Sequence, residues 1–208
     1  MIDGSVTFVL LREGPSDDGL IPHLATLILR AGGVEAIGQP INYSGTVANK
    51  LRLLMLERDD IDIAFVHRDA DRVGPVRRRA EIARAIEHAG ITAAVVPVIP
   101  VQELEAWLLV DASAVRNVVG RPLGRTDLRL PKLAGIEATR SPKEILQSAL
   151  LVASETTGRR REKEKRDFEK RRRALLDRLD VDGPVRQLPA WQQLESDVAA
   201  AVASLSEG

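Results

Sequence analysis

The run Val6-Thr7-Phe8-Val9-Leu10-Leu11 is almost continuously apolar and rich in β-forming residues, which is typical of a strand buried on both faces of a sheet. Three later segments are also predicted to be strands, at residues 39–43, 61–66 and 94–99. The first of these is more polar and is expected nearer an edge. Amphipathic segments with helical spacing separate the strands, at residues 18–30, 47–57 and 76–88. This alternation predicts an α/β fold, with a parallel sheet flanked by helices.

The length of the chain, 208 residues, suits one main domain and an appendage. The strand pattern stops after Pro100. Helices are predicted in the remaining sequence, at residues 102–110, from Ser141 onward and at 191–205. We therefore expect a sheet-bearing domain over residues 1–112 and a helical C-terminal extension over 113–208, packed on or beside it.

The composition excludes several classes of protein. Lys and Arg together number 30, as do Asp and Glu, so only local clusters of charge can favour nucleic acid. The absence of Cys excludes disulfides, thiolate zinc sites and a cysteine nucleophile. The first apolar run is far shorter than the roughly 20 residues of a membrane span, and it lacks the basic lead and cleavage site of a secretion signal. We expect a cytoplasmic protein without membrane association.

Carboxylates follow the predicted strands. Glu13 leaves the first strand at a Gly-Pro turn, and Asp69 and Asp71 follow the third strand, where an extended chain would point both to the same side. The carboxyl ends of parallel strands meet at one edge, so these side chains are expected to gather there. Gathered carboxylates repel one another, and a divalent cation is the usual partner that stabilises them. Hard oxygen donors favour Mg²⁺ or Mn²⁺.

This pattern, a glutamate after the first strand and Asp-x-Asp after the third, resembles that of the TOPRIM domain at Glu13, Asp69 and Asp71. Four segments together also resemble the bacterial domain-of-unknown-function family 4276, at residues 9–18, 67–71, 103–109 and 141–143. That family is similar to nucleases of the OLD (overcoming lysogenization defect) type. The resemblance implies a TOPRIM-like, Rossmann-like fold and a role in phage defence with an ATPase partner.

The same resemblance assigns metal ligands. Asp17 lies where OLD-type nucleases hold a second metal ion, and Glu105 is preferred to Glu103 because it lies beside Trp107 in the matching segment. One ion held by Glu13, Asp69 and Asp71 would orient a phosphate oxygen and lower the pKa of a bound water. A second ion near Asp17 and Glu105 would stabilise the leaving oxygen.

Other residues near these acids have weaker assignments. Lys143, at a predicted helix start, is expected to approach the site and neutralise charge in the transition state. His67 is expected to pack or hydrogen bond rather than to shuttle protons. Arg68 and Arg72 flank the aspartates, and they either grip phosphate oxygens or offset local charge.

Two features that other TOPRIM enzymes need are missing from this sequence, which narrows the set of possible reactions. Topoisomerases need a tyrosine nucleophile on a further domain, and the only tyrosine here, Tyr43, lies in or near a predicted strand. The related primases bring a cysteine-bearing zinc module. A magnesium-dependent endonuclease or nickase remains, with DNA favoured over RNA as substrate. Its predicted nucleic-acid contacts are Arg72, Arg160, Arg161, Arg171 and Arg172.

Several alternatives stay open. The run 159–173 also places acids and bases at i,i+4, the spacing of a self-paired, solvent-exposed helix. The alternative to the nuclease function is a catalytically silent TOPRIM scaffold that docks an ATPase or nucleic acid. A receiver-like phosphoacceptor domain ranks third, because Val98-Ile99-Pro100 supplies no lysine at the end of the fourth strand. The apolar faces of the later helices either form a homodimer or pack onto the sheet.

Overall fold

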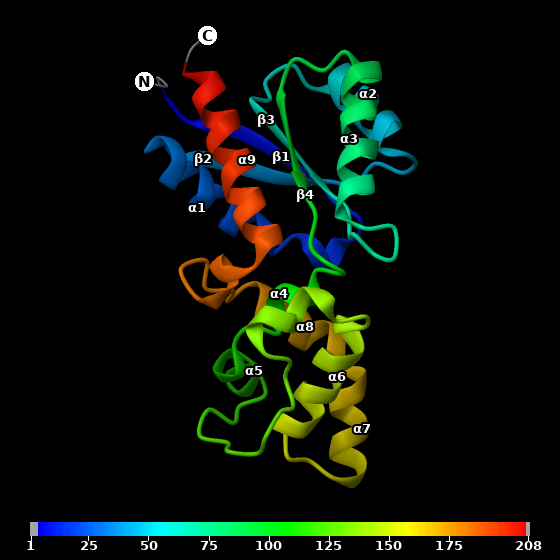
Figure 1. Ribbon diagram of the computed structural model, residues 1–208, viewed down its shortest axis with the longest axis vertical. Helices are drawn as coiled ribbons and strands as arrows, with labels where there is room; N and C mark the ends of the chain where they lie inside the picture. Colours follow the sequence, from blue (N-terminus) through cyan, green and yellow to red (C-terminus); the bar gives the residue numbers. More distant parts are fainter. Residues whose placement is uncertain (1–3, 207–208) are drawn as a thin grey trace. The chain divides into compact units, whose positions relative to one another are not determined.

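The computed structural model describes residues 4–206 (Figure 1). Within these residues one sheet is formed by four parallel strands, β1 (Val6–Leu11), β2 (Ala36–Ile41), β3 (Ile63–His67) and β4 (Ala94–Val98). The helices that accompany the sheet are α1 (Leu20–Gly32), α2 (Val47–Glu57), α3 (Pro75–Ala89) and α9 (Pro189–Leu205). The predicted α/β, Rossmann-like architecture of a parallel sheet flanked by helices is confirmed.

The strands lie in the order β2-β1-β3-β4, so β1 and β3 are central. Phe8 of β1 meets Phe65 of β3 edge to face, with ring centroids 5.4 Å apart, and both rings are fully buried. Each edge strand contains a proline, Pro40 in β2 and Pro97 in β4. Proline is confined to such positions because it has no N–H to donate to a neighbouring strand. The edge placement predicted for the second strand is confirmed, although the strand begins at Ala36.

The order of the strands contains one reversal of direction. The chain passes from β1 to β2 on one side of the sheet's centre, and then crosses back through α2 to β3 on the other side of β1. In open parallel sheets this reversal leaves a crevice beyond the carboxyl ends of the two strands concerned, where ligands bind. Here those strands are β1 and β3.

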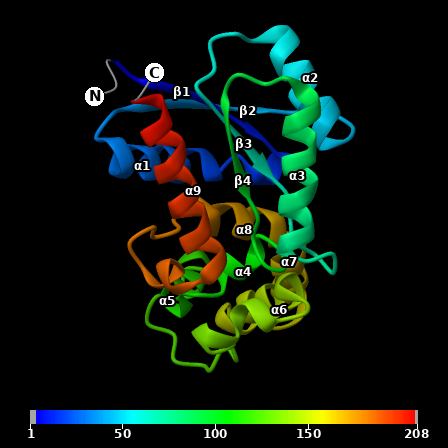
Figure 2. The ribbon, with the colours of Figure 1, turned by 45° about the horizontal axis from the view of Figure 1, so that its top comes forward.

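Amphipathic helices cover the sheet. The apolar positions predicted for α1, namely Leu20, Leu24, Leu27 and Ile28, are all buried. α2 has the predicted bounds and buries Val47, Leu51 and Leu54. In both ribbon views α2 and α3 lie side by side (Figures 1 and 2). Since α3 directly follows the loop after β3, it can supply side chains to the carboxyl edge of the sheet.

The chain divides into two compact units. The first contains the described residues of Met1–Ile99 and of Gln192–Gly208, and the second is Pro100–Trp191. The division therefore falls earlier than the predicted boundary between 112 and 113, and most of the last helix belongs with the sheet. Asp197 of α9 pairs with Arg79 of α3 at 2.8 Å, which shows how that helix is anchored in the first unit.

The second unit is helical. Its helices are α4 (Glu105–Leu108), α5 (Ala112–Val118), α6 (Pro142–Ala153), α7 (Gly158–Arg166) and α8 (Phe168–Leu176), with 3-10 turns at Leu133–Ala138 and Pro184–Gln187. Trp107 packs edge to face on Trp191 at 4.9 Å, which fits the expectation that Trp107 is a packing residue. The predicted helix at 102–110 shrinks to α4, and the charged run 159–173 is broken near Asp167.

Candidate functional site

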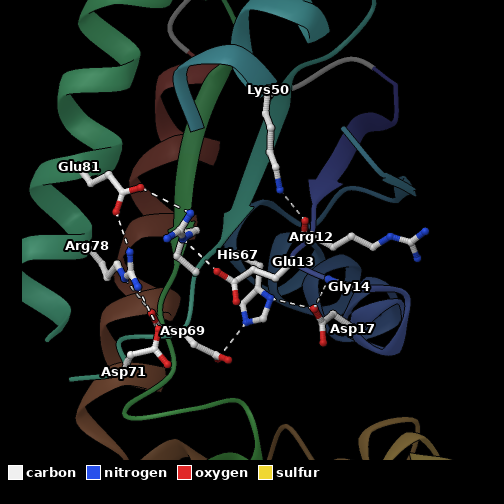
Figure 3. Close-up of polar contacts among 11 residues, drawn as sticks. Arg12, Glu13, Gly14, Asp17, Lys50, His67, Asp69, Asp71, Arg78 and Glu81 are labelled. Atoms are coloured by element: carbon white, nitrogen blue, oxygen red, sulfur yellow. Dashed lines mark hydrogen bonds and ion pairs between the residues drawn. The ribbon is translucent and has the colours of Figure 1, made fainter. Parts of the chain in front are cut away.

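Charged side chains gather where β1 and β3 end, at the crevice defined by the strand order (Figure 3). β1 ends at Leu11 and leads into Arg12 and Glu13, while β3 ends at His67 and leads into Arg68 and Asp69. These two strands are hydrogen-bonded neighbours. The predicted convergence of the two strand ends is thus what the sheet produces.

His67 lies between two carboxylates. Its Nδ1 atom is 3.2 Å from Oδ2 of Asp17, and its Nε2 atom is 3.4 Å from Oδ1 of Asp69. Burial alone would lower the pKa of the imidazole, but the contacts with Asp17 and Asp69 prevail and raise it to about 9. His67 is therefore a buried cation at neutral pH, held by one acid on each side.

Asp17 is fixed by the turn that follows β1. The 3-10 turn Pro15–Asp17 places its carboxylate so that Oδ2 accepts a hydrogen bond from the backbone N–H of Gly14 at 3.0 Å. Only 3% of Asp17 is exposed. Its neighbour Asp18 instead forms an ion pair with Arg12. Asp17 is therefore the aspartate that joins this turn to His67.

Glu13 projects from the end of β1 toward the loop after β3. Its Oε1 atom is 2.9 Å from Nε of Arg68. Burial raises the pKa of Glu13; His67 and Arg68 act in the opposite direction, whereas the charges of Asp69 and Asp71 raise it further. Asp69 and Asp71 are therefore near enough to Glu13 for their negative charges to act on it.

Asp71 reaches the site by a route that the sequence pattern did not indicate. β3 ends at His67, and Asp71 has a backbone φ of 48°, so the extended conformation expected to align Asp69 and Asp71 is wrong. This left-handed conformation is uncommon for a residue other than glycine and is often found at functional sites. The tight turn, rather than strand alternation, sets the direction of Asp71.

Arg78 of α3 ties this turn together. Its Nη2 atom donates to Oδ2 of Asp71 at 2.9 Å, and its Nε atom donates to the backbone carbonyl of Asp69 at 3.0 Å. Its third contact is with Glu81, at 3.0 Å. Glu81 also lies 3.5 Å from Arg68, so one carboxylate on α3 contacts both arginines.

Lys50 of α2 reaches the same edge from above in the view of Figure 3. It is 9% exposed, and its Nζ atom donates to the backbone carbonyl of Arg12 at 2.9 Å. Burial lowers the pKa of Lys50, while the nearby charge of Glu13 acts in the opposite direction. The sequence interpretation missed Lys50 because it lies in the first turn of an ordinary amphipathic helix, with no motif around it.

The donor chemistry suits a hard cation, but the carboxylates already have partners. Glu13 and Asp71 are held by Arg68 and Arg78, and His67 lies between Asp17 and Asp69. Across residues 4–206, no group of three or more His, Asp and Glu side chains is arranged to hold a metal ion. A metal ion would therefore need Arg68 and Arg78 to move away from Glu13 and Asp71.

Two other predicted site residues lie in the second unit. Glu105 is 4% exposed and its Oε1 atom accepts a hydrogen bond from Nε of Arg172 at 2.8 Å. Lys143 lies 3.3 Å from Glu169 and 5.6 Å from the ring centroid of Phe168. Glu105, predicted as a metal ligand, and Arg172, predicted to bind nucleic acid, are thus partners of each other.

The other arginines predicted to contact nucleic acid differ in whether they already have partners within their own unit. Arg72 and Arg160 are exposed. Arg161 donates weakly to the carbonyl of Leu151 at 3.5 Å. Arg171 pairs with Glu164 at 3.1 Å and donates to the carbonyl of Val118. Arg171 is therefore engaged inside the second unit, whereas Arg72 and Arg160 are open to solvent.

The fold and this edge define an α/β protein of the Rossmann-like class, with a charged site at the carboxyl ends of its central strands. The family model described as Domain of unknown function (DUF4276) matches residues 12–199, and the chain belongs to this family. No curated protein and no solved structure matches the chain significantly. Among residues 4–206, no helix combines the length and apolar character needed to cross a membrane.

Proposed function

We propose that the chain is a metal-dependent nuclease of the TOPRIM type, related to OLD-type nucleases, which hydrolyses phosphodiester bonds in DNA. The observation that supports this most is the gathering of Glu13, Asp69 and Asp71 beyond the ends of β1 and β3, at the reversal in strand order. A role in phage defence beside an ATPase belongs to the same proposal and rests on the likeness to OLD-type nucleases.

Glu13, Asp69 and Asp71 are the residues that would hold Mg²⁺ or Mn²⁺, with Asp17 next to them. A cation held there would polarise a phosphate oxygen and lower the pKa of a bound water. His67 positions Asp69 and Asp17, and Lys50 holds the peptide from which Glu13 extends. Once released from the acids, Arg68 and Arg78 are suited to grip phosphate oxygens, because guanidinium groups match phosphate geometry.

The test is cleavage of supercoiled plasmid with Mg²⁺, Mn²⁺ or EDTA. The wild type is compared with Asp69→Ala/Asp71→Ala and with a control, Asp59→Ala/Glu87→Ala, that removes two exposed acids elsewhere in the first unit. We expect metal-dependent nicking that the first variant loses and the control keeps. Nicking that persists in the first variant would remove these aspartates from the chemistry.

The ion pairs at the site favour a second candidate, a catalytically silent scaffold that docks an ATPase or nucleic acid. Arg68 and Arg78 neutralise Glu13 and Asp71 without any metal ion. Titration calorimetry with Mn²⁺ separates the two candidates. Heat of binding that is lost in Asp69→Ala/Asp71→Ala supports the nuclease, whereas absence of binding by the wild type supports the scaffold.

A further inference from the structure

A groove of about 410 Å³ lies between the first turn of α2 and one face of α3. Its walls include Thr46, which caps α2, Val47 of α2, and four residues of α3, namely Arg77, Glu81, Arg84 and His88. The four residues of α3 recur every three or four positions, the spacing that aligns side chains along one face of a helix. The groove is therefore a continuous strip rather than an isolated pit.

The free charge of this strip is positive. Arg77 and Arg84 are exposed, and neither guanidinium has a hydrogen-bond or ion-pair partner among residues 4–206. The adjacent arginines differ, since Arg78 is held by Asp71 and Arg79 by Asp197. The acid in the groove wall, Glu81, is already engaged by Arg78 and Arg68. Arg77 and Arg84 are thus left to meet an external anion.

The strip begins at the candidate site. Glu81, in the groove wall, is 3.0 Å from Arg78 and 3.5 Å from Arg68, the two arginines that hold Asp71 and Glu13. Seven residues separate Arg77 from Arg84, which is about 10 Å along a helix that rises 1.5 Å per residue. Phosphates of one DNA strand follow one another about every 3.4 Å along the duplex axis. The two guanidiniums therefore span about three phosphates.

We propose that this face of α3, with Arg77 and Arg84 as its anchors, binds the phosphate backbone of the nucleic acid on one side of the bond to be cleaved. The proposal rests on the nuclease function above and adds the path of the substrate. The first turn of α2 supports it, because backbone N–H groups at the start of a helix favour anions.

The test is fluorescence anisotropy with a labelled DNA duplex of about 20 base pairs in EDTA, over a series of NaCl concentrations. Arg77→Glu/Arg84→Glu should bind at least about tenfold more weakly at low salt. The slope of log affinity against log salt should fall by about 1.8, which corresponds to two lost phosphate contacts. Arg77→Lys/Arg84→Lys should keep the slope, since a phosphate contact needs only the charge.

The matched control is Arg125→Glu/Arg140→Glu, which reverses two exposed arginines of the second unit. It should lose less affinity than the α3 variant. Equal losses in the two variants would mean that net charge alone is measured, and would overturn the proposal. Unchanged affinity in the α3 variant, or absence of binding by the wild type, would overturn it as well.

The outcome of this experiment does not depend on the proposed nuclease activity, because EDTA prevents metal-dependent cleavage and the assay measures binding alone. DNA binding that depends on Arg77 and Arg84, without nicking by the wild type, would uphold the α3 face and reject the nuclease. If nicking is lost only in Asp69→Ala/Asp71→Ala, and DNA binding is unchanged in Arg77→Glu/Arg84→Glu, the nuclease is upheld and the α3 face is rejected. Thermal melting by circular dichroism shows whether each variant is folded.

Discussion

The Nδ1 atom of His67 donates to Oδ2 of Asp17 across 3.2 Å, and the two residues are only 1% and 3% exposed. This contact links the end of β3 to the turn that follows β1. A buried imidazolium and a buried carboxylate are stable together because each offsets the charge of the other. The pair therefore joins the two strand ends on which the candidate site is built.

The protonation of His67 should make stability depend on pH. Its pKa in the folded protein is about 9, above the ordinary 6.5, so protonation favours the folded state. The stabilisation is complete below about pH 6.5 and is lost as the pH rises through about 9. Urea unfolding of the metal-free protein should show this decline. Asp17→Asn should lower the pKa of His67, measured by NMR titration, and flatten the decline; an unchanged pKa would contradict the geometry.

Lys50 should act through the position of Glu13. Lys50→Met removes the hydrogen bond to the carbonyl of Arg12, which precedes Glu13. If Glu13 binds the metal, Mn²⁺ affinity or nicking should fall about 10- to 100-fold, the usual effect of losing an outer-shell contact. Lys50→Arg should keep part of the Mn²⁺ affinity or nicking that Lys50→Met loses. Lys132→Met, which removes an exposed lysine, serves as control; equal effects in the two methionine variants would exclude this role.

Arg78 should compete with metal ions for Asp71. Arg78→Gln leaves Asp71 without its ion pair, so Mn²⁺ should bind up to about fivefold more tightly, since a partly exposed pair is worth about 1 kcal/mol. Calorimetry measures the affinity. Weaker binding in this variant would show that Arg78 supports the ligand arrangement through its contact with the Asp69 carbonyl instead of opposing the metal.

The pair of Glu105 and Arg172 should be a structural element of the second unit. Glu105→Ala removes the carboxylate that Arg172 contacts in the interior and should cost about 3 to 5 kcal/mol of unfolding free energy. The double variant Glu105→Leu/Arg172→Met should recover most of that loss. If Glu105 instead acts mainly as a metal ligand, Glu105→Gln will weaken Mn²⁺ binding more than it lowers the melting temperature.

Gly38 should not accept a side chain. It lies in β2 opposite Phe8 of β1, and a Cβ atom added there would overlap the buried phenyl ring. Gly38→Ala should therefore destabilise the protein by about 1 to 3 kcal/mol, as overpacking of a core does. Phe8→Leu in the same chain should relieve the overlap, so the double variant should lose less than the sum of the two single losses.

The sheet was predictable from the sequence because its signals are local. β1 and α2 have the predicted bounds, since an unbroken apolar run and a 3.6-residue period are both visible in a short window. The helix predicted at 102–110 forms only over Glu105–Leu108. Its apolar residues Ala106, Trp107 and Leu108 are buried in the second unit, and Trp107 packs on Trp191, a long-range contact that a short window of sequence does not show.

The acids of the candidate site were predictable, but their partners were not. Position at a strand end is enough to bring Glu13 and Asp69 to the same edge. The contacts of Arg78, Glu81 and Lys50 depend on how α2 and α3 pack, which no short motif encodes. The left-handed conformation of Asp71 follows from that turn and cannot be inferred from an Asp-x-Asp pattern.

The double contact of Glu81 links the two arginines that hold the acids of the candidate site. Arg68 and Arg78 occupy Glu13 and Asp71, and both also contact Glu81 on α3. A sliding or rotation of α3 would therefore carry both guanidiniums with it, and the two acids would be vacated together rather than in turn. If the proposed groove on that helix binds a phosphate backbone, its occupancy and the availability of the two acids would then be coupled.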